Sequence, residues 1–203
     1  FFEKYGQMDR SKLGLAGPGE WEALRELMPE FQGKRVLDLG CGYGWHCAYA
    51  AEHRAASVLG IDLSERMLEV ARQQHSGPVI EYRRCAIEDI DVPDGSLDVV
   101  FSSLAFHYVQ DFGVVMDRVW RWLVPGGRFL FSVEHPIFTA CGSQDWYRDG
   151  EGKILHFPVD RYFEEGERKA NFLGEDVVKY HRTLTTYLDG LLVRGFRLLR
   201  VVE

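Results

Sequence analysis

A short stretch, DLGCGYGWH at residues 38–46, combines residue types that can hold a charged ligand. Every second position in its middle is glycine: Gly40, Gly42 and Gly44. Glycine permits positive φ and lets a ligand approach the backbone closely. The helix expected to begin near Trp45 presents unpaired N–H groups and a partial positive charge, which favour an anion. Asp38 beside the loop repels a phosphate but attracts an ammonium group. These charges favour a ligand that carries both a carboxylate and an ammonium.

The glycine spacing separates the possible ligands. It is G-x-G-x-G, whereas a dinucleotide-binding loop has G-x-G-x-x-G, and the bulky Trp45 follows the third glycine. No Gly-Lys-Ser/Thr follows, which excludes a phosphate-binding P-loop. The methionine end of S-adenosylmethionine carries a carboxylate and an ammonium without a phosphate, so it satisfies both charges. The alternative is a tight turn that holds no ligand.

A second acidic residue, Asp62, closes the next expected strand, residues 57–62. It lies 18 residues past Gly44, where a carboxylate accepts hydrogen bonds from the ribose hydroxyls of a nucleoside. NAD sites also use an acid here, so Asp62 alone does not distinguish the two cofactors. Together with the glycine loop, it favours S-adenosylmethionine.

Strands and helices that alternate along the chain must position these residues. The expected strands are continuous apolar runs, which are typical of a parallel sheet covered on both faces. The alternation predicts an α/β fold with a doubly wound, mostly parallel sheet. The expected strands are residues 34–40, 57–62, 79–85, 97–104 and 128–134, with a sixth at 197–203. The expected helices are residues 17–29, 45–55, 112–123 and 183–196, and one that Ser64 caps and that buries Met67, Leu68 and Ala71.

Residues 136–182 interrupt this alternation. They contain clusters of Gly, Asp and Glu around three short possible strands, at 154–159, 168–172 and 177–182. We interpret them as a lid inserted after the fifth strand. The chain then forms a single domain with four parts: an N-terminal helical cap (1–33), a cofactor-binding core (34–135), an inserted substrate lid (136–182), and a final helix and strand (183–203).

Composition limits the class of protein. The chain has 203 residues, of which 46% are hydrophobic, enough for one domain with a sizeable core. Its net charge of -7 argues against a nucleic-acid-binding protein. The four cysteines include no C-x-x-C pair, so we expect reduced thiols, no metal site and a cytoplasmic protein. No apolar run is long enough to cross a membrane, so no membrane partner is expected, and the oligomeric state is left open.

At the level of whole motifs, the chain resembles a class I S-adenosylmethionine-dependent methyltransferase of the small-molecule kind known as type 11. The resemblance covers nearly the whole chain and rests on four segments: VLDLGCGYG, GIDLSERML, AIEDIDVPDGSLDVVFSSLAFHYV and LVPGGRFLFSVEHP. It implies a Rossmann-like methyltransferase fold, with S-adenosyl-L-methionine as the methyl donor and S-adenosyl-L-homocysteine as the product.

The resemblance also implies which residues surround the cofactor. For the methionine moiety they are Asp38, Gly40, Gly42 and Gly44, with Cys41 in the same loop; for the ribose, Asp62; for the adenine, Leu63, Met67, Ala86 and Ile87; and for the floor near the sulfonium, Ser102 to Leu104. Many relatives place an aspartate near Cys85 to accept from the adenine amino group. Here Glu88, Asp89 or a water must do so. By the same resemblance, the N-terminal segment folds over the cofactor with Tyr5, Met8 and Arg10.

Polar side chains at two strand ends are the candidates for chemistry on the acceptor. His107 follows the fourth expected strand, and Glu134 and His135 stand at the end of the fifth. Methyl transfer needs a nucleophile in line with the sulfonium, and a general base helps where that nucleophile carries a proton. We expect Glu134 and His135 to contact substrate, with His135 as a candidate proton acceptor. His107 has three open roles: a base, a hydrogen-bond donor to substrate, or a residue of the floor. His181 and Arg182, at the end of the insert, are expected at the rim, where they could reach an anionic substrate; the alternative is a surface ion pair or the entry to a helix.

The sequence therefore predicts an enzyme that transfers a methyl group from S-adenosylmethionine to an O, N or C atom of a small organic molecule. One alternative is a non-catalytic sensor or scaffold that binds S-adenosylmethionine. Another is an NAD-type oxidoreductase on a similar fold, which the glycine spacing, Trp45 and Asp38 disfavour.

Overall fold

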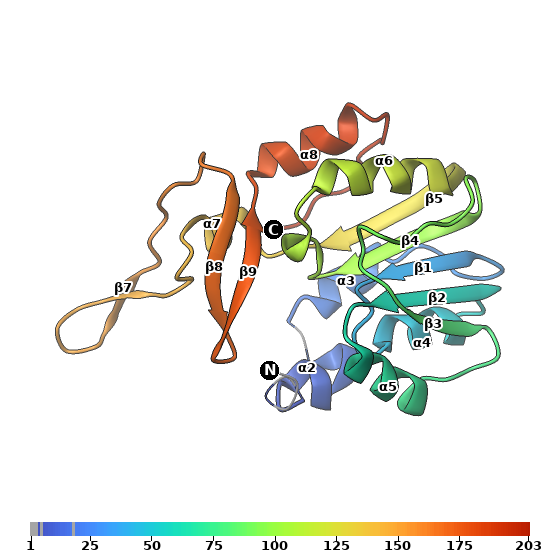
Figure 1. The fold of residues 1–203 in the computed structure, drawn as a ribbon, viewed down its shortest axis with the longest axis horizontal. Coiled ribbons are helices and arrows are strands. Elements are labelled where there is room, and N and C mark those ends of the chain that lie inside the picture. Colours follow the sequence, from blue (N-terminus) through green and yellow to red (C-terminus); the bar gives the residue numbers. More distant parts are fainter. Residues whose placement is uncertain (1–3, 5, 18) are drawn as a thin grey trace.

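The computed structural model describes residues 4, 6–17 and 19–203. Its centre is a parallel sheet of five strands in the order β3-β2-β1-β4-β5 (Figure 1). The strands are β1 (Arg35–Leu39), β2 (Ser57–Asp62), β3 (Ile80–Arg84), β4 (Leu97–Ser103) and β5 (Leu123–Ser132). The order reverses between β1 and β4, and sheets of this kind bind ligands at the carboxyl ends beside such a reversal. The predicted α/β fold with a doubly wound parallel sheet is confirmed.

Helices cover both faces of the sheet. They are α2 (Asp9–Lys12), α3 (Trp21–Leu27), α4 (Trp45–Glu52), α5 (Glu65–Gln74), α6 (Phe112–Trp122) and α8 (Leu184–Leu192), with 3-10 turns η1 (Gly14–Ala16) and η2 (Phe106–Tyr108). On β1, Val36 packs in one cluster with α4 and α5, while Leu37 packs in another with α6 and α8. Because successive strand residues point to opposite faces, a strand between two helical layers can be apolar on both faces. The continuous apolar runs of the sequence have this origin.

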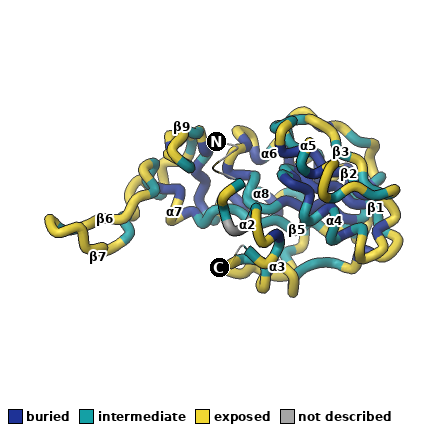
Figure 2. The backbone as a smooth tube through the Cα atoms, turned by 90° about the horizontal axis from the view of Figure 1, so that it is seen from below, coloured by how far each residue is buried: buried dark blue, intermediate teal, exposed yellow. Residues whose placement is uncertain are grey.

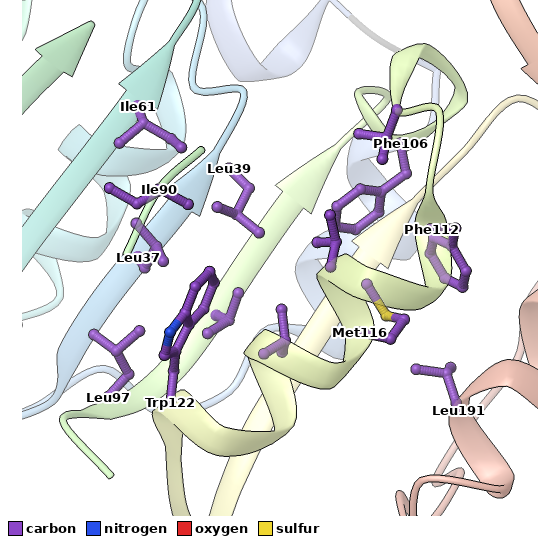
Figure 3. Packing of buried hydrophobic residues seen from close by; sticks show 14 of the residues in the cluster. Leu37, Leu39, Ile61, Ile90, Leu97, Phe106, Phe112, Met116, Trp122 and Leu191 are labelled. Carbon is purple, nitrogen blue, oxygen red and sulfur yellow. The ribbon is translucent and has the colours of Figure 1, made fainter. Parts of the chain in front are cut away.

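The larger cluster also supports the end of β4. Phe112, Met116 and Trp122 of α6 belong to it, together with Leu37 and Leu39 of β1 and Phe106 of η2 (Figure 3). Phe106 is fully buried. The hydrophobic core thereby anchors the short turn that carries the next residue, His107.

Side-chain caps begin several of the helices. The Ser64 hydroxyl accepts from the backbone N–H of Met67 at α5, as predicted, and Met67, Leu68 and Ala71 are the buried residues of that helix. Asp111 caps α6 through the N–H of Val114. Such caps satisfy N–H groups that have no partner within the helix.

The insert forms a separate, smaller layer beyond the carboxyl ends of β4 and β5 (Figure 1). It contains α7 (Pro136–Ala140), a two-stranded β6–β7 pair (Tyr147–Arg148 and Ile154–His156) and an antiparallel hairpin of β8 (Gly166–Phe172) and β9 (Glu175–His181). The β6–β7 arm extends away from the body and is largely exposed (Figure 2). The β8–β9 hairpin packs on the body, with β9 against η2.

Several expectations for the insert and the C-terminal segment need correction. The expected strand at 154–159 shortens to β7, and both α7 and β6 were not predicted. Pro136 in the first turn and His135 as the cap mark the start of α7. Residues 197–203, expected to form a sixth strand, form no strand, although the structure describes all of them. A strand requires a hydrogen-bonded neighbour, and apolar composition alone does not supply one. In the described part of the chain, no helix is long and apolar enough to cross a membrane.

Asp38 is an ionisable group in the middle of the sheet. It is 2% exposed, and β1 pairs with β2 and β4 on either side of it. Its Oδ2 accepts from Cys47 Sγ at 3.4 Å, and its buried Oδ1 has no hydrogen-bond partner among the described groups. Burial raises the pKa of the Asp38 carboxyl to about 7, and the negative charge of Asp62 adds to this rise. The native protein therefore holds a proton on Asp38 at mildly acidic pH.

This proton makes stability depend on pH in a defined direction. Because the folded-state pKa lies above the unfolded value, the unfolded chain releases the proton first, and stability falls as pH rises from about 4 to about 7. The difference amounts to about 4 kcal/mol, at 1.36 kcal/mol for each unit of pKa shift. Asp38→Asn should remove this loss, so the variant gains stability over the wild type as pH rises. Urea unfolding at several pH values measures the difference, with the exposed Asp94→Asn as control. Parallel curves for wild type and Asp38→Asn would contradict the assignment.

Candidate functional site

The glycine loop, residues 40–44, joins β1 to α4 in a conformation that only glycine adopts easily. Gly40, Gly42 and Gly44 have φ of 81°, 54° and 79°. The N–H groups of Gly40 and Cys41 both donate to the carbonyl of Ile61, at 2.9 and 2.8 Å. Space is also limiting: a Cβ on Gly40 would lie 2.6 Å from the Cβ of Ala105, and one on Gly44 would overlap the hydroxyl of Tyr82 in β3. The loop is therefore closely fitted to the ends of β1, β2 and β4.

Asp62 holds the same loop from the end of β2. Its Oδ2 accepts from the N–H of Gly42 at 2.9 Å, and its Oδ1 accepts from the N–H of Ser64 at 2.8 Å. Burial raises the pKa of the Asp62 carboxyl, while these backbone hydrogen bonds oppose the rise. A carboxylate oxygen can accept more than one hydrogen bond. The side chain lines the cavity described next, so it can both fix the loop and accept from a ligand hydroxyl.

A cavity of about 340 Å³ lies over the carboxyl ends of the strands. Its lining runs from Asp62, at the end of β2, to Glu134, just past β5, and thus crosses the point where the strand order reverses. The described lining residues are Met8, Ser11, Gly14, Leu15, Gly40, Cys41, Gly42, Tyr43, Trp45, His46, Asp62, Ser64, Met67, Ser103, Leu104, Ala105, His107, Tyr108, Glu134 and Phe172. Its size falls in the range of small-molecule sites.

The N-terminal segment covers one side of this cavity. Met8 and Ser11 reach it from the region of α2, and Gly14 and Leu15 reach it from η1. A Cβ on Gly14 would lie 2.8 Å from the Trp45 ring, so the segment packs directly on the start of α4. Met8 therefore lies where the family resemblance implied. Tyr5 and the side chain of Arg10, named with it, lie outside the described residues.

Several residues expected at the cofactor do not line the cavity. The Ser102 hydroxyl is fully buried and donates to the carbonyl of Leu39 at 2.8 Å, whereas its neighbours Ser103 and Leu104 do line it. Leu63 is exposed at the surface. Three more of the expected residues are absent from the lining: the buried Asp38, Gly44 at the cap of α4, and Ile87, which packs against the core. Ala86 and Glu88 instead line a second, more open cavity with Asp89. Their contact with the cofactor stays a prediction.

Two of the three candidate catalytic residues come together in the cavity wall. His107 is 2% exposed, and its Nε2 lies 3.9 Å from Glu134 Oε1. The third, His135, has its ring elsewhere. Its Nδ1 accepts from the N–H of Ile137 at the start of α7, and its Nε2 lies 2.5 Å from Glu203 Oε1. Because Pro136 starts a helix immediately after it, His135 serves as that helix's cap and does not line the cavity.

The insert supplies residues to this wall that sequence reasoning missed. Phe172 of β8 lines the cavity. Lys179 of β9 donates to Glu134 Oε1 at 2.6 Å and to Gln144 Oε1 at 2.9 Å, while Gln144 Nε2 donates to Glu134 Oε2 at 3.0 Å. The partners are 35 to 45 residues from Lys179 in sequence. The sequence signal was weak: Lys179 follows two valines in the expected strand 177–182, but His181 and Arg182 in the same strand are also polar.

His181 and Arg182 are buried and do not stand at the rim, so that expectation was wrong. His181 Nε2 donates to the carbonyl of Tyr162 at 2.8 Å, and its Nδ1 lies 2.8 Å from Thr139 Oγ1. Burial lowers the pKa of His181. Arg182 donates to the carbonyls of Phe106, Val109 and Gln110. Both side chains satisfy backbone or hydroxyl groups that folding would otherwise leave without partners. They attach the end of the insert to η2 and α7.

These features fit the ligand that the loop spacing predicts. The cavity presents a tight glycine loop at the start of α4 and a carboxylate, Asp62, at the end of β2. Directly behind the loop, Asp38 offers a buried oxygen that lacks a partner, which suits a nearby cation. Within the described residues, no group of three or more His, Cys, Asp or Glu side chains is arranged to hold a metal ion.

Comparisons with known proteins agree with this geometry. Residues 37–131 match a family model described as a methyltransferase domain. The chain is 34% identical to the phosphoethanolamine N-methyltransferase of Triticum aestivum over 88% of its own length, but it spans only 35% of that enzyme. Because the chain spans about a third of that enzyme, the substrate of that enzyme is not assigned to this chain.

Two solved structures cover most of both chains. One is a protein from Listeria monocytogenes proposed to be an S-adenosylmethionine-dependent methyltransferase, at 56% identity and a TM-score of 0.88, with 91% of this chain and 87% of that chain covered. The other is an S-adenosylmethionine-dependent methyltransferase from Mesorhizobium loti, at 47% identity and a TM-score of 0.83, with 91% and 84% covered. The chain therefore belongs to the S-adenosylmethionine-dependent methyltransferases, and it is an enzyme that uses this cofactor as its methyl donor.

Proposed function

We propose that this enzyme methylates a nitrogen or oxygen atom of a small organic molecule, with carbon as the alternative. One observation carries the proposal: a single cavity joins the glycine loop and Asp62 to a second set of side chains, which we call the acceptor wall. The acceptor wall consists of His107, Tyr108, Glu134 and Phe172. It lies toward β4 and β5, whereas Asp62 lies at β2, so cofactor and acceptor can occupy neighbouring parts of the same space.

The acceptor wall offers a place for the proton that an amine or hydroxyl loses. When bound, S-adenosylmethionine supplies an electrophilic methyl group, and the protein must orient the acceptor and take up its proton. In the neutral imidazole with its proton on Nδ1, His107 Nε2 can accept that proton. Glu134 lies beside it at 3.9 Å and can orient the acceptor or stabilise the charge that forms on the imidazole.

We further propose that residues 136–182 act as a lid. Phe172 places an aromatic ring in the cavity lining, and β9 packs against η2, which carries His107 and Tyr108. A cover over the reacting groups excludes water and shapes the pocket for one class of acceptor. The contacts of the β8–β9 hairpin support this role, whereas the β6–β7 arm extends away from the body (Figure 1) and contributes no residue to the cavity lining.

The proposal predicts turnover with labelled cofactor. S-adenosylmethionine with a labelled methyl group should label at least one amine or hydroxyl compound in a metabolite panel. His107→Asn should then lower kcat roughly 10²-fold, because general-base catalysis is lost, and should leave S-adenosylhomocysteine affinity nearly unchanged. His53→Asn, at the exposed end of α4, is the matched control. Tight S-adenosylhomocysteine binding with no labelled product would instead favour the sensor or scaffold alternative.

Asp62→Ala should weaken S-adenosylhomocysteine binding by roughly 1–3 kcal/mol, because the ribose hydroxyls lose a charged acceptor. Calorimetry measures the affinity, and NAD should give no binding heat to the wild type. The exposed Asp91→Ala serves as the control. Equal affinities for wild type and Asp62→Ala would contradict the ribose assignment.

Gly42→Val should abolish S-adenosylhomocysteine binding in a protein that still folds. The β-branched side chain resists the φ of 54° and projects from a residue that lines the cavity. Gly95→Val is the matched control, since Gly95 has a φ of 62° in an open turn, where an added Cβ would meet no atom within 4 Å. Circular dichroism checks folding and calorimetry checks binding. Normal binding by Gly42→Val would place the cofactor elsewhere.

A further inference from the structure

We propose that Lys179 is a positioning residue for the reaction: it holds the negative charge of Glu134 so that His107 stays neutral and can take up the acceptor's proton. This inference rests on the proposed function of His107. Lys179 belongs to the insert and lies outside the four sequence segments that carry the family resemblance. Its effect on the reaction would pass through Glu134 and not through contact with the acceptor.

The geometry sets Glu134 between two possible cationic partners. Its Oε1 lies 2.6 Å from Lys179 Nζ and 3.9 Å from His107 Nε2. The lysine is within hydrogen-bond distance, whereas the imidazole is not. The carboxylate therefore pairs with Lys179. Gln144 completes the arrangement, since its amide donates to Glu134 Oε2 and its oxygen accepts from Lys179.

Lys179 is buried, and the loss of hydration of its ammonium group costs free energy that a buried apolar side chain would not cost. The Lys179 side chain is 1% exposed, and Nζ lies 5.3 Å from the centre of the Phe172 ring and 5.9 Å from that of Tyr108. Both rings belong to the acceptor wall. An apolar residue of similar volume would avoid the loss of hydration, so a buried ion pair is weak evidence for a purely stabilising role.

The strand register places a second buried cation directly opposite Lys179. Across the β8–β9 hairpin, Lys179 lies directly opposite Arg168, and both are buried. Like charges at such a cross-strand pair destabilise a hairpin. The two side chains find separate acceptors, because Arg168 donates to the carbonyls of Ala140 and Glu164. The hairpin thus delivers one of its two buried cations to the acceptor wall.

Removal of the Lys179 charge should change the protonation state of the His107 imidazole. A carboxylate without a cationic partner favours the protonated form of a nearby histidine, because opposite charges attract more strongly in a buried site. In Lys179→Met, Gln144 still donates to Glu134 Oε2, and His107 is the nearby side chain that can supply the missing positive charge. A protonated His107 cannot accept a proton from the acceptor. The consequence would be an enzyme that binds its cofactor but turns over slowly.

The test uses the ¹⁵N resonances of the His107 imidazole in the whole protein saturated with S-adenosylhomocysteine at neutral pH. His107→Asn assigns the signals. Lys179→Met should raise the protonated fraction of His107 about fivefold or more, and Lys179→Met combined with Glu134→Gln should return it toward wild type. The control is Lys169→Met, which removes an exposed lysine from the neighbouring strand β8.

The outcomes separate this inference from the proposed function. Unchanged His107 signals in Lys179→Met, or an equal change in the double variant, would overturn the role of Lys179 even if the enzyme turns over normally. If Lys179→Met does not fold, Lys179→Gln keeps a donor to Glu134 without its charge and should give the same shift. Because no acceptor is added, the measurement does not depend on whether methyl transfer has been detected.

Discussion

The hydrogen bonds between the glycine loop and the end of β2 are the constraint on which the rest of the site depends. The Ile61 carbonyl accepts from two loop N–H groups, and Asp62 accepts from a third, at Gly42. The parallel pairing of β1 with β2 brings Leu39 opposite Ile61, so the sheet register itself sets the distance between loop and acid. A loop fixed in this way by the neighbouring strand is held in its shape by the protein's own hydrogen bonds, so its shape does not have to form when a ligand binds.

A second constraint acts at the other end of the cavity, where the insert is attached by buried polar groups. Arg182 donates to three backbone carbonyls around η2, and His181 joins Thr139 to the carbonyl of Tyr162. Buried groups of this kind are costly when unpaired, so each contact specifies one arrangement of the insert on the body. The turn that carries His107 is held on one side by Phe106 in the core and on the other by Arg182 from the insert.

The core of the fold could be predicted from sequence because its elements are determined by local patterns. Apolar runs between helical layers, the Ser64 cap and the glycine loop each follow from interactions within a few residues, and all appear where expected. The structure of the insert depends instead on contacts between residues that are distant in sequence. Its buried face carries Lys179 and His181, whose side chains have partners that lie 19 to 45 residues away, so periodicity gives no indication that these residues are inside. His135 was misplaced for a related reason: a residue before proline at a strand end can equally cap a helix.

The contacts at the two ends of the cavity differ in how far apart their residues lie in sequence. The glycine loop and Asp62 can form within the β1–β2 unit, whose contacts are short in sequence, whereas the pairing of Glu134 with Lys179 spans 45 residues. Long-range polar contacts of this kind form only after the hairpin has docked, since their loop-closure cost must be met first. The glycine loop and Asp62 can therefore be in place before the pairing of Glu134 with Lys179 has formed. If residues 136–182 act as the proposed lid, order at the acceptor wall depends on whether the β8–β9 hairpin is seated, and the insert would then shape the part of the cavity that meets the acceptor.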